Sequence, residues 1–331
     1  MAVKLNKMRE EIVERFISAL SENQIPWQKA WRGCGIPKNA ISDKPYTGVN
    51  NFSLQLTALE KGYTDNRWCT FNQAKDRGYK IKEGEHGSKI EYWGFFDKEK
   101  KENILPKDLR KRIAEIEAEG KDWREIVKPV SKIYYVFNVE QMDGVKTVEQ
   151  VILPKNDDLV SNRDKLIAAL EVGFKEGGNS ACYVPSQDEI RMPLWEDFKS
   201  EYGYMATFLH EAAHSTGSSK RLNRNIENTF GSPDYAKEEL RAEITSAFLA
   251  QQLGFGSADR LDNHSAYIQS WIDVLENKPN ELFAAIKEAE AIADYLIEKG
   301  ELEKAKTELI ELQEEINEER HREKGKVKDD I

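Results

Sequence analysis

The stretch YMATFLHEAAHSTGSSKRLN, Tyr204–Asn223, carries two histidines four residues apart, His210 and His214, with Glu211 beside the first. On a helix, residues four apart lie one above the other on the same face. Two imidazoles in that arrangement can bind one zinc ion, and the adjacent carboxylate can act as a general base toward water. The residues around them are mostly apolar, so these polar groups would be buried and would need partners. The stretch therefore predicts a metal-binding helix; the alternative is a pair of hydrogen-bonded core histidines.

A catalytic zinc site has three protein ligands and one open position, so a third ligand must lie elsewhere in the chain. One zincin class takes it from a histidine six residues after the second, but that position is Lys220 here. The segment Tyr235–Gly254 instead predicts an amphipathic helix, with Glu243 on its apolar face by three–four spacing. A buried carboxylate needs a cation, so we predict Glu243 as the third ligand. Glu239, one turn earlier, is the alternative ligand or a hydrogen-bond partner of a ligand histidine.

Other polar residues around this predicted site receive separate roles. Glu238 and Arg241, on the same predicted helix, are expected to face solvent. His264 begins a later helix and could donate a hydrogen bond to an oxyanion, and Tyr267, three residues on, could do the same. The two remaining histidines lie in charged segments, and we assign them no role.

Length and charge narrow the class of protein. The chain has 331 residues, which predicts two domains, and a formal net charge of −10. Residues 1–90 contain 15 Lys and Arg against 10 Asp and Glu, a net of +5, so the remaining residues carry −15. This asymmetry permits a basic N-terminal binding surface. No apolar run approaches the roughly 20 residues of a membrane span, no signal-peptide pattern is present, and three scattered cysteines indicate no disulfide framework. We therefore expect a cytoplasmic protein without a membrane partner.

The order of the predicted elements indicates an α+β chain. Residues 1–155 would form an α+β domain, with helices near residues 4–20 and 51–61. Two aromatic strands in this domain would flank a charged insertion at residues 97–132, which has a helical pattern near residues 107–120. Because such a charged segment does not suit a sheet, we expect the insertion to lie outside it.

A mostly helical domain, residues 156–300, would follow a linker with the sequence VEQVILPKNDD. Two short strands around a turn are expected before the helix that bears the two histidines. The tail, residues 301–331, is expected to be charged and helical or disordered. About two heptads of a coiled-coil pattern occur in it, at Leu302, Ala305, Leu309, Leu312 and Ile316.

Aromatic and basic residues are interleaved through the first 95 residues. Sequence-tolerant binding of single-stranded nucleic acid combines a basic groove with aromatic platforms. Tyr46 lies between a proline and a glycine in a predicted loop that cannot bury it easily, and Asn50 could hold a phosphate or a base edge. The alternative is that these aromatic residues form a core. The candidate nucleic-acid contacts are Trp27, Trp31, Arg32, Lys38, Tyr46, Asn50, Arg67, Trp68 and Lys82.

Several segments occur in an order that carries a family resemblance. They are PWQKAW, PKNAISDKPYTGVNNFSL, RWCTFNQAKDRGYKIKEGEHGSKIEYW, FLHEAAHSTGSSKRLNR, YAKEELRAEITSAFL and YIQSWIDVL. From Met8 to Lys299 the chain resembles the ArdC family of antirestriction proteins, which plasmids, phages and other mobile elements encode. The resemblance does not cover the insertion or the tail beyond Gly300. In the histidine motif the chain has alanines and Ser215 where a larger apolar residue and an aromatic are more usual.

The resemblance implies an N-terminal domain that binds single-stranded DNA and a C-terminal zincin-like metallopeptidase domain. It also implies that His210, His214 and a carboxylate of the EELRAE segment bind the metal, with Glu211 as the base. We therefore expect zinc, with Mn²⁺ or another divalent ion as the alternative, and a protein substrate that the sequence does not identify.

Three other hypotheses compete with a DNA-associated zinc peptidase. The first is a protective single-strand-binding protein whose metal domain is structural or catalytically weak. A general protease fits the basic, aromatic N-terminal region poorly, and a primase-associated role lacks an acidic polymerase-type metal motif. Glu211 beside both histidines favours catalysis, because a structural zinc site has no need for a base.

Overall fold

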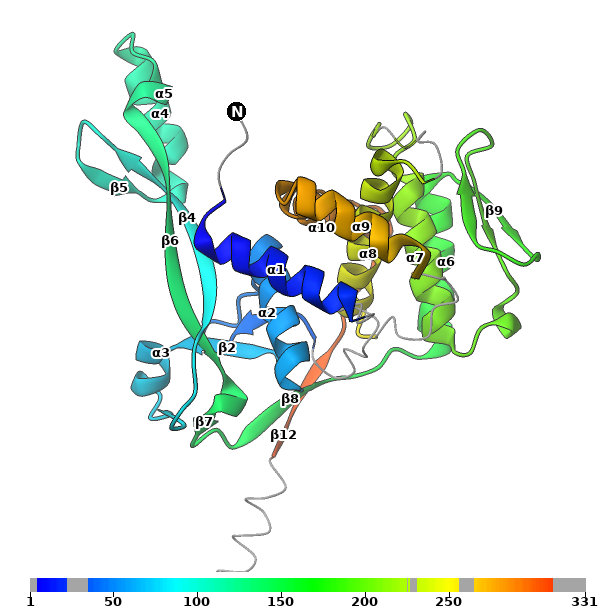
Figure 1. Ribbon diagram of the computed structural model, residues 1–331, viewed down its shortest axis with the longest axis horizontal. Helices are drawn as coiled ribbons and strands as arrows, with labels where there is room; N and C mark the ends of the chain where they lie inside the picture. The colour runs from blue at the N-terminus through cyan, green and yellow to red at the C-terminus, as the bar shows by residue number, and fades with distance from the viewer. Residues whose placement is uncertain (1–4, 23–34, 225, 227–230, 256–264, 312–331) are drawn as a thin grey trace, which may run out of the picture.

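The computed structural model describes residues 5–22, 35–224, 226, 231–255 and 265–311. It is a mixed α+β structure, which confirms the expected fold class (Figure 1). The N-terminal half is built on a five-stranded sheet, and the C-terminal half on packed helices beside a three-stranded sheet. None of the helices in the described part of the chain is both long and apolar enough to cross a membrane.

The N-terminal sheet has the strand order β1-β2-β6-β4-β5. Its strands are β1 (Lys38–Asn39), β2 (Arg67–Thr70), β4 (Ser88–Asp97), β5 (Glu102–Ile104) and β6 (Val127–Asn138). β4 and β6 pair antiparallel along the whole of β4 and project from the molecule as a long ribbon (Figure 1). A short pair, β3 (Lys80–Ile81) and β7 (Met142–Asp143), follows the same antiparallel pattern. The predicted pair of aromatic strands is therefore present.

Two helices pack close to this sheet. α2 (Gly48–Lys61) ends at Gly62, which adopts a left-handed conformation with φ of 75°. Leu54 of α2 lies in a small buried cluster with Trp68 of β2 and Val136 of β6. α3 (Phe71–Asp76) begins with a capping box in which the Thr70 side chain accepts from the Gln73 amide. These contacts give the N-terminal half a core of its own.

The charged insertion lies at the far end of the ribbon (Figure 1). It contains β5, α4 (Leu109–Ala118) and α5 (Trp123–Ile126), so the expected helix is present. The expectation that the whole of residues 97–132 lies outside the sheet is wrong, because β5 adds to the sheet edge and β6 already starts at Val127. A buried ion pair, Arg112 Nε to Asp97 Oδ2 at 2.5 Å, joins α4 to the end of β4.

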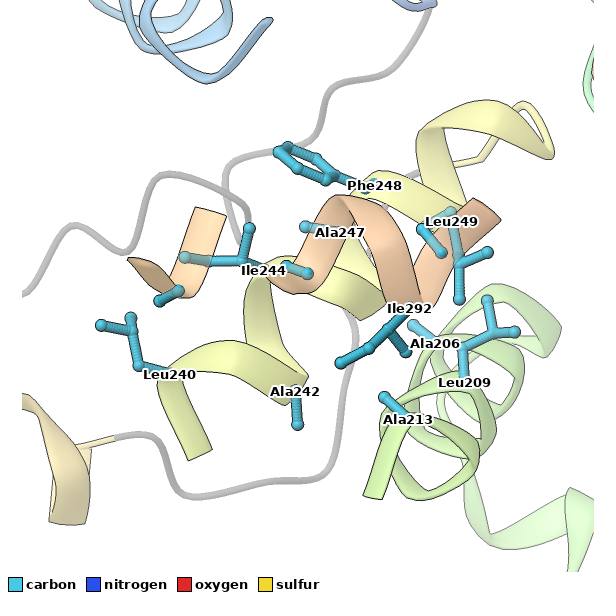
Figure 2. Close-up of a cluster of buried hydrophobic side chains, with 14 of the residues drawn as sticks. Ala206, Leu209, Ala213, Leu240, Ala242, Ile244, Ala247, Phe248, Leu249 and Ile292 are labelled. Atoms are coloured by element: carbon cyan, nitrogen blue, oxygen red, sulfur yellow. The ribbon is translucent and has the colours of Figure 1, made fainter. Parts of the chain in front are cut away.

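The C-terminal half consists mainly of helices. They are α6 (Asn156–Leu170), α7 (Glu201–Ser215), α8 (Pro233–Gln252), α9 (Ser265–Asn277) and α10 (Asn280–Lys299). The sheet beside them has the order β10-β11-β9, from β9 (Gly173–Glu176), β10 (Cys182–Val184) and β11 (Glu189–Met192). β10 and β11 form the predicted pair of strands around a turn. Figure 2 shows part of the core, where apolar side chains of α7, α8 and α10 gather.

The N-terminal helix α1 (Lys7–Ser21) belongs to this second core. Its apolar face, including Ile12 and Phe16, is buried in one cluster with residues of α7 to α10, and Phe52 of α2 joins the same cluster. Phe16 and Phe52 meet edge to face, with ring centroids 5.5 Å apart. The expected division at residue 156 coincides with the start of α6, but it does not separate the two packing units. The apolar face of α1 is buried because helices of the C-terminal half pack against it.

The coiled-coil expectation for the tail is wrong over residues 307–311, which form strand β12 (Thr307–Glu311). β12 pairs antiparallel with β8 (Thr147–Val151) in the segment that links the two halves. The Ala305 amide donates to the Gln252 carbonyl at 2.7 Å, just after the end of α8. Pairing with β8 satisfies the backbone groups of β12, whereas two isolated heptads have no partner helix to bury their seam. Leu312 and Ile316 of the expected seam lie outside the described residues.

Candidate metal centre

The site is built where α7 and α8 lie side by side in the C-terminal half (Figure 1). Ser200 caps α7 by accepting from the Gly203 amide, and Ser232 caps α8 by accepting from the Tyr235 amide. The two helices approach closely at small residues. There the Ser246 hydroxyl of α8 donates to the Ala206 carbonyl of α7 at 2.7 Å. This packing sets the α8 carboxylates against the histidines of α7.

His210 and His214 lie together on the face of α7 that meets α8, as their spacing predicts. Their Nε2 atoms are 3.0 Å apart. The two carboxylate oxygens of Glu239 reach this pair: Oε2 lies 3.5 Å from His210 Nε2, and Oε1 lies 3.5 Å from His214 Nε2. All three side chains are largely shielded from solvent. One ligand atom from each of these residues lies within 4.8 Å of the others, which is a cluster able to hold a metal ion.

The opposite nitrogen of each imidazole meets a different carboxylate. His210 Nδ1 lies 3.3 Å from Glu243 Oε1, and His214 Nδ1 lies 3.1 Å from Glu238 Oε1. With protons on both Nδ1 atoms, which is the tautomer these carboxylates favour, the two Nε2 atoms turn lone pairs toward each other. Lone pairs 3.0 Å apart repel unless a cation lies between them. The donor set therefore fits a divalent ion, whose nitrogen and oxygen ligands lie about 2.0–2.2 Å from it.

Glu238 was expected to face solvent, and this expectation is wrong. Its side chain is almost completely buried, and it accepts from Arg224 at 2.6 Å and from Arg241 as well as meeting His214. Burial opposes ionisation, but the hydrogen bond from His214 and the charges of Arg224 and Arg241 outweigh it and lower the pKa of Glu238 to about 2. Helical spacing alone places Glu238 on the side away from Leu240 and Ile244, but α8 is buried on almost all sides. The signal that could have found it is chemical: two ligand histidines need two acceptors for their second nitrogens, besides a third ligand.

The structure thus brings Glu239, and not the favoured Glu243, to the Nε2 atoms. Glu243 occupies the position that was expected of Glu239, beside the far nitrogen of a histidine. Both carboxylates lie on the buried side of α8, one turn apart, as their spacing predicts. Relative to the prediction from the sequence, the positions of the two carboxylates around the histidines are exchanged.

A strand of the three-stranded sheet lies near Glu211. Glu211 is buried on α7 and lies close enough to Cys182 of β10 for its charge to act, after burial, in raising the pKa of that thiol. β10 is an outer strand of its sheet, so one of its edges faces away from β11. The strand packs against α7.

A pair of tyrosines lies on the α8 side of the site. The hydroxyls of Tyr235 and Tyr267 are 3.4 Å apart, and Tyr267 stacks on Trp271 of α9. Burial, the bond to Tyr267 and the charge of Glu239 all raise the pKa of Tyr235, so its hydroxyl keeps its proton. The sequence had indicated Tyr267 but not Tyr235. His264 lies outside the described residues.

The candidate nucleic-acid contacts are mostly engaged within the protein. Trp68 is fully buried, and Tyr46, expected to be exposed, is half-buried against it. Arg67 is paired with Asp65, and Lys38 with Asp43 and Glu149.

Asn50 and Lys82 have structural partners as well. Asn50 covers the free edge of β4, donating to the Glu91 carbonyl at 2.8 Å and accepting from the Glu91 amide at 2.7 Å. Lys82 is exposed and donates to the Glu140 carbonyl. Trp27, Trp31 and Arg32 lie outside the described residues. The described part of this half exposes other aromatic residues instead: Phe71 at the start of α3, Tyr92 and Trp93 on β4, and Tyr134 and Tyr135 on β6. None of them is among the contacts proposed from the sequence.

Comparisons with known proteins agree with both halves. Residues 6–137 match the N-terminal domain of anti-restriction factor ArdC, and residues 161–288 match the zincin-like metallopeptidase family. The metal-free crystal structure of the antirestriction ArdC protein from plasmid R388 superposes with a TM-score of 0.67, at 29% identity, over 90% of this chain and 100% of that one. The chain belongs to the ArdC family. The Mn(II)-bound crystal structure of the same R388 protein matches with a TM-score of 0.66.

Curated relatives place the ArdC fold in larger proteins too. A DNA primase TraC of Escherichia coli is 36% identical over 305 residues, which is 90% of this chain but 28% of that protein. Protein y4eC of Sinorhizobium fredii is 29% identical over 88% of this chain and 90% of its own length. This ArdC-family chain therefore spans less than a third of the length of that TraC relative. The four glutamates of α7 and α8 described above, Glu211, Glu238, Glu239 and Glu243, lie within the part that matches the zincin-like family.

Proposed function

We propose that this protein is an antirestriction-type protein of a mobile element that binds single-stranded DNA and carries a metal-dependent peptidase site. Membership of the ArdC family supports the antirestriction role, and the zincin-like half supports the chemistry. The observation that carries the chemical proposal is the geometry of the histidine pair, with both Nε2 atoms turned toward Glu239 and each Nδ1 toward another carboxylate.

His210, His214 and Glu239 would hold the ion, with Glu243 and Glu238 fixing the orientation of the two imidazoles. Carboxylate partners on the second nitrogen raise the basicity of a ligand histidine and hold its ring in place. The donors are two nitrogens and one carboxylate, a set that catalytic zinc sites use. Zinc is therefore our proposed ion, and the Mn(II)-bound R388 structure supports a divalent ion in this family.

When bound, a divalent ion supplies a Lewis acid that polarises the carbonyl group of a substrate. Glu211 is the next residue after the proposed ligand His210 and is not itself one of the three proposed ligands. It would accept the proton of the attacking water and pass it to the leaving amine. The protonated hydroxyl of Tyr235 or Tyr267 would donate a hydrogen bond to the oxygen on which negative charge develops.

The position of β10 supports a peptide as the substrate. It is an outer strand beside α7, and its residue Cys182 lies near Glu211. An extended peptide can pair with the free edge of such a strand through its main chain. The scissile bond would then pass close to the proposed base.

The test is a Glu211→Gln variant of the full chain, with the exposed Glu196→Gln of the same half as the matched control. We expect Glu211→Gln to keep its metal content and fold but to lose peptide cleavage, because the amide cannot accept a proton. Glu196→Gln should retain both. Restriction protection in cells then separates the two leading hypotheses. Protection that survives Glu211→Gln would assign the function to DNA binding, with a metal domain that is structural.

A further inference from the structure

The β4–β6 ribbon exposes large side chains that have no core to join. Tyr92 and Trp93 of β4 are each about half exposed, as are Tyr134 and Tyr135 of β6. Ile133, which precedes Tyr134 on β6, is also exposed. Contiguous exposed apolar surface of this kind generally marks a binding site. In the register of the ribbon, Tyr92 and Trp93 lie near its middle, and Tyr134 and Tyr135 lie toward the end away from the insertion. The insertion lies at the far tip of the ribbon (Figure 1).

The register of the ribbon divides these residues between two faces. Residues directly opposite each other in an antiparallel pair share a face, and successive residues of a strand alternate. Tyr92 lies opposite Lys132, and Tyr134 is two residues along on the same face. We call these three residues the tyrosine face. Trp93, Ile133 and Tyr135 lie on the other side, which we call the helix face because α1 contacts it.

The helix face has its charges engaged by α1. Arg9 pairs with the buried carboxylate of Glu91 at 2.8 Å, and its guanidinium lies 5.7 Å from the ring centre of Trp93. Lys89, opposite Tyr135, bonds to Glu11 at 2.5 Å. The basic groups on this side are therefore neutralised, and one aromatic ring already has a cation beside it.

The tyrosine face differs in charge. Within the part of the chain that the structure describes, Lys132 forms no ion pair, and its side chain is exposed. The rings of Tyr92 and Tyr134 lie 6.3 Å apart at an interplanar angle of 85°. A flat base cannot stack on two perpendicular rings at once, so each ring offers a separate platform. Gly94, next on this face, has no side chain to cover Tyr92: a Cβ there would come 3.5 Å from the edge of the ring.

We propose that the tyrosine face is the binding site for single-stranded DNA, with one base stacked on Tyr92, another on Tyr134, and a phosphate paired with Lys132. This inference rests on the proposed single-strand binding and gives it a location. Aromatic rings combined with an unpaired cation are the chemistry that binds single strands with little sequence preference. Paired bases are not free to stack on side chains, so duplex DNA should bind more weakly.

The experiment measures binding of a fluorescent oligothymidylate to the full-length protein by anisotropy. Tyr92→Ala and Tyr134→Ala should each weaken binding about 5- to 150-fold, as expected for the loss of one stacked base. Tyr135→Ala is the matched control, because it removes an equally exposed tyrosine from the helix face of the same strand. It should leave the dissociation constant unchanged. Thermal melting of each variant checks that the exposed substitution has left the fold intact.

A second arm tests the proposed phosphate contact. Lys132→Gln should make the plot of log Kd against log salt shallower by about 0.7, the contribution of one phosphate contact to single-strand binding. The exposed Lys278→Gln, at the end of α9, should not change the slope.

The outcomes separate the two proposals. Absence of oligothymidylate binding by the wild-type protein would refute single-strand binding itself, and the tyrosine face with it. Wild-type binding that Tyr135→Ala weakens as much as Tyr92→Ala and Tyr134→Ala, or that none of them changes, would overturn the location alone.

Discussion

Glu238 Oε1 lies 3.1 Å from His214 Nδ1, on the side of the imidazole that faces away from His210. The same glutamate pairs with Arg224 and Arg241, so the orientation of a proposed ligand histidine depends on a buried network of charges. The neighbouring residue on α8, Glu239, faces the other nitrogen of the same ring. Two adjacent carboxylates can thus take different roles toward one histidine, and this relationship makes the ligand assignment testable.

The first prediction separates Glu239 from Glu243. Glu239→Gln should lose stoichiometric metal, because a neutral amide replaces the charged ligand, whereas Glu243→Gln should lower metal affinity only about 10- to 100-fold. Metal content after dialysis against a graded chelator series measures both. Equal loss in the two variants would contradict the assignment, and full retention in Glu239→Gln would return the ligand role to Glu243.

The second prediction concerns the N-terminal helix. Phe16→Ala should destabilise the protein by about 3–5 kcal/mol, because it removes a fully buried ring from the core that α1 shares with the C-terminal half. Glu14→Ala, an exposed change on the same helix, should have little effect. Denaturant unfolding followed together with metal release provides the measurement. If Phe16→Ala lowers stability without easing metal release, α1 is not part of the unit that carries the site.

The third prediction distinguishes backbone strain from a steric clash at Gly254. Gly254 has φ of 86°, and a Cβ there would come 2.6 Å from Ala305 Cβ and 2.9 Å from Val151 Cγ1. Gly62 has φ of 75°, but nothing lies within 4 Å of the corresponding position. Both Gly→Ala changes cost about 1–2 kcal/mol for the left-handed conformation. Only Gly254→Ala should add about 1–3 kcal/mol for overpacking against the β8–β12 pair. Similar melting temperatures for the two variants would argue against that contact.

The fourth prediction is a pH dependence. Asp188 binds Arg221 and Tyr183, and although burial opposes ionisation these bonds lower its pKa below the usual value of about 3.9. A lowered pKa in the folded state adds stability above the unfolded pKa, and that stability is lost as the pH falls through the folded pKa. Asp188→Asn should therefore melt several degrees below the wild type at pH 7, and the difference should shrink below about pH 4. A difference that stays constant from pH 7 to pH 3 would mean that the charge of Asp188 contributes nothing.

The sequence by itself predicted most of the helices and strands described here and the pair of histidines that could bind a metal. The four-residue spacing of His210 and His214 requires one helix face, and the capped, apolar segments around them become α7 and α8 as expected. The antiparallel aromatic strands and the helical insertion also follow from local composition, and the order of segments along the chain predicted the family correctly. These features depend on periodicity and residue type, which the chain carries locally.

Only the tertiary structure decided which carboxylate faces which nitrogen. Glu238, Glu239 and Glu243 all lie on or beside the buried side of α8, and periodicity gives their angles about the helix axis but not the position of α7 against that axis. Likewise, residue type could not tell the buried Trp68 from the exposed Tyr92, because burial depends on strands and helices distant in the sequence. The strand at residues 307–311 depends on β8, more than 150 residues earlier. Contacts between distant segments decide the facing of the carboxylates, the burial of these aromatic residues and the formation of β12. The free energy of these contacts outweighs the weak secondary-structure preferences of any short segment.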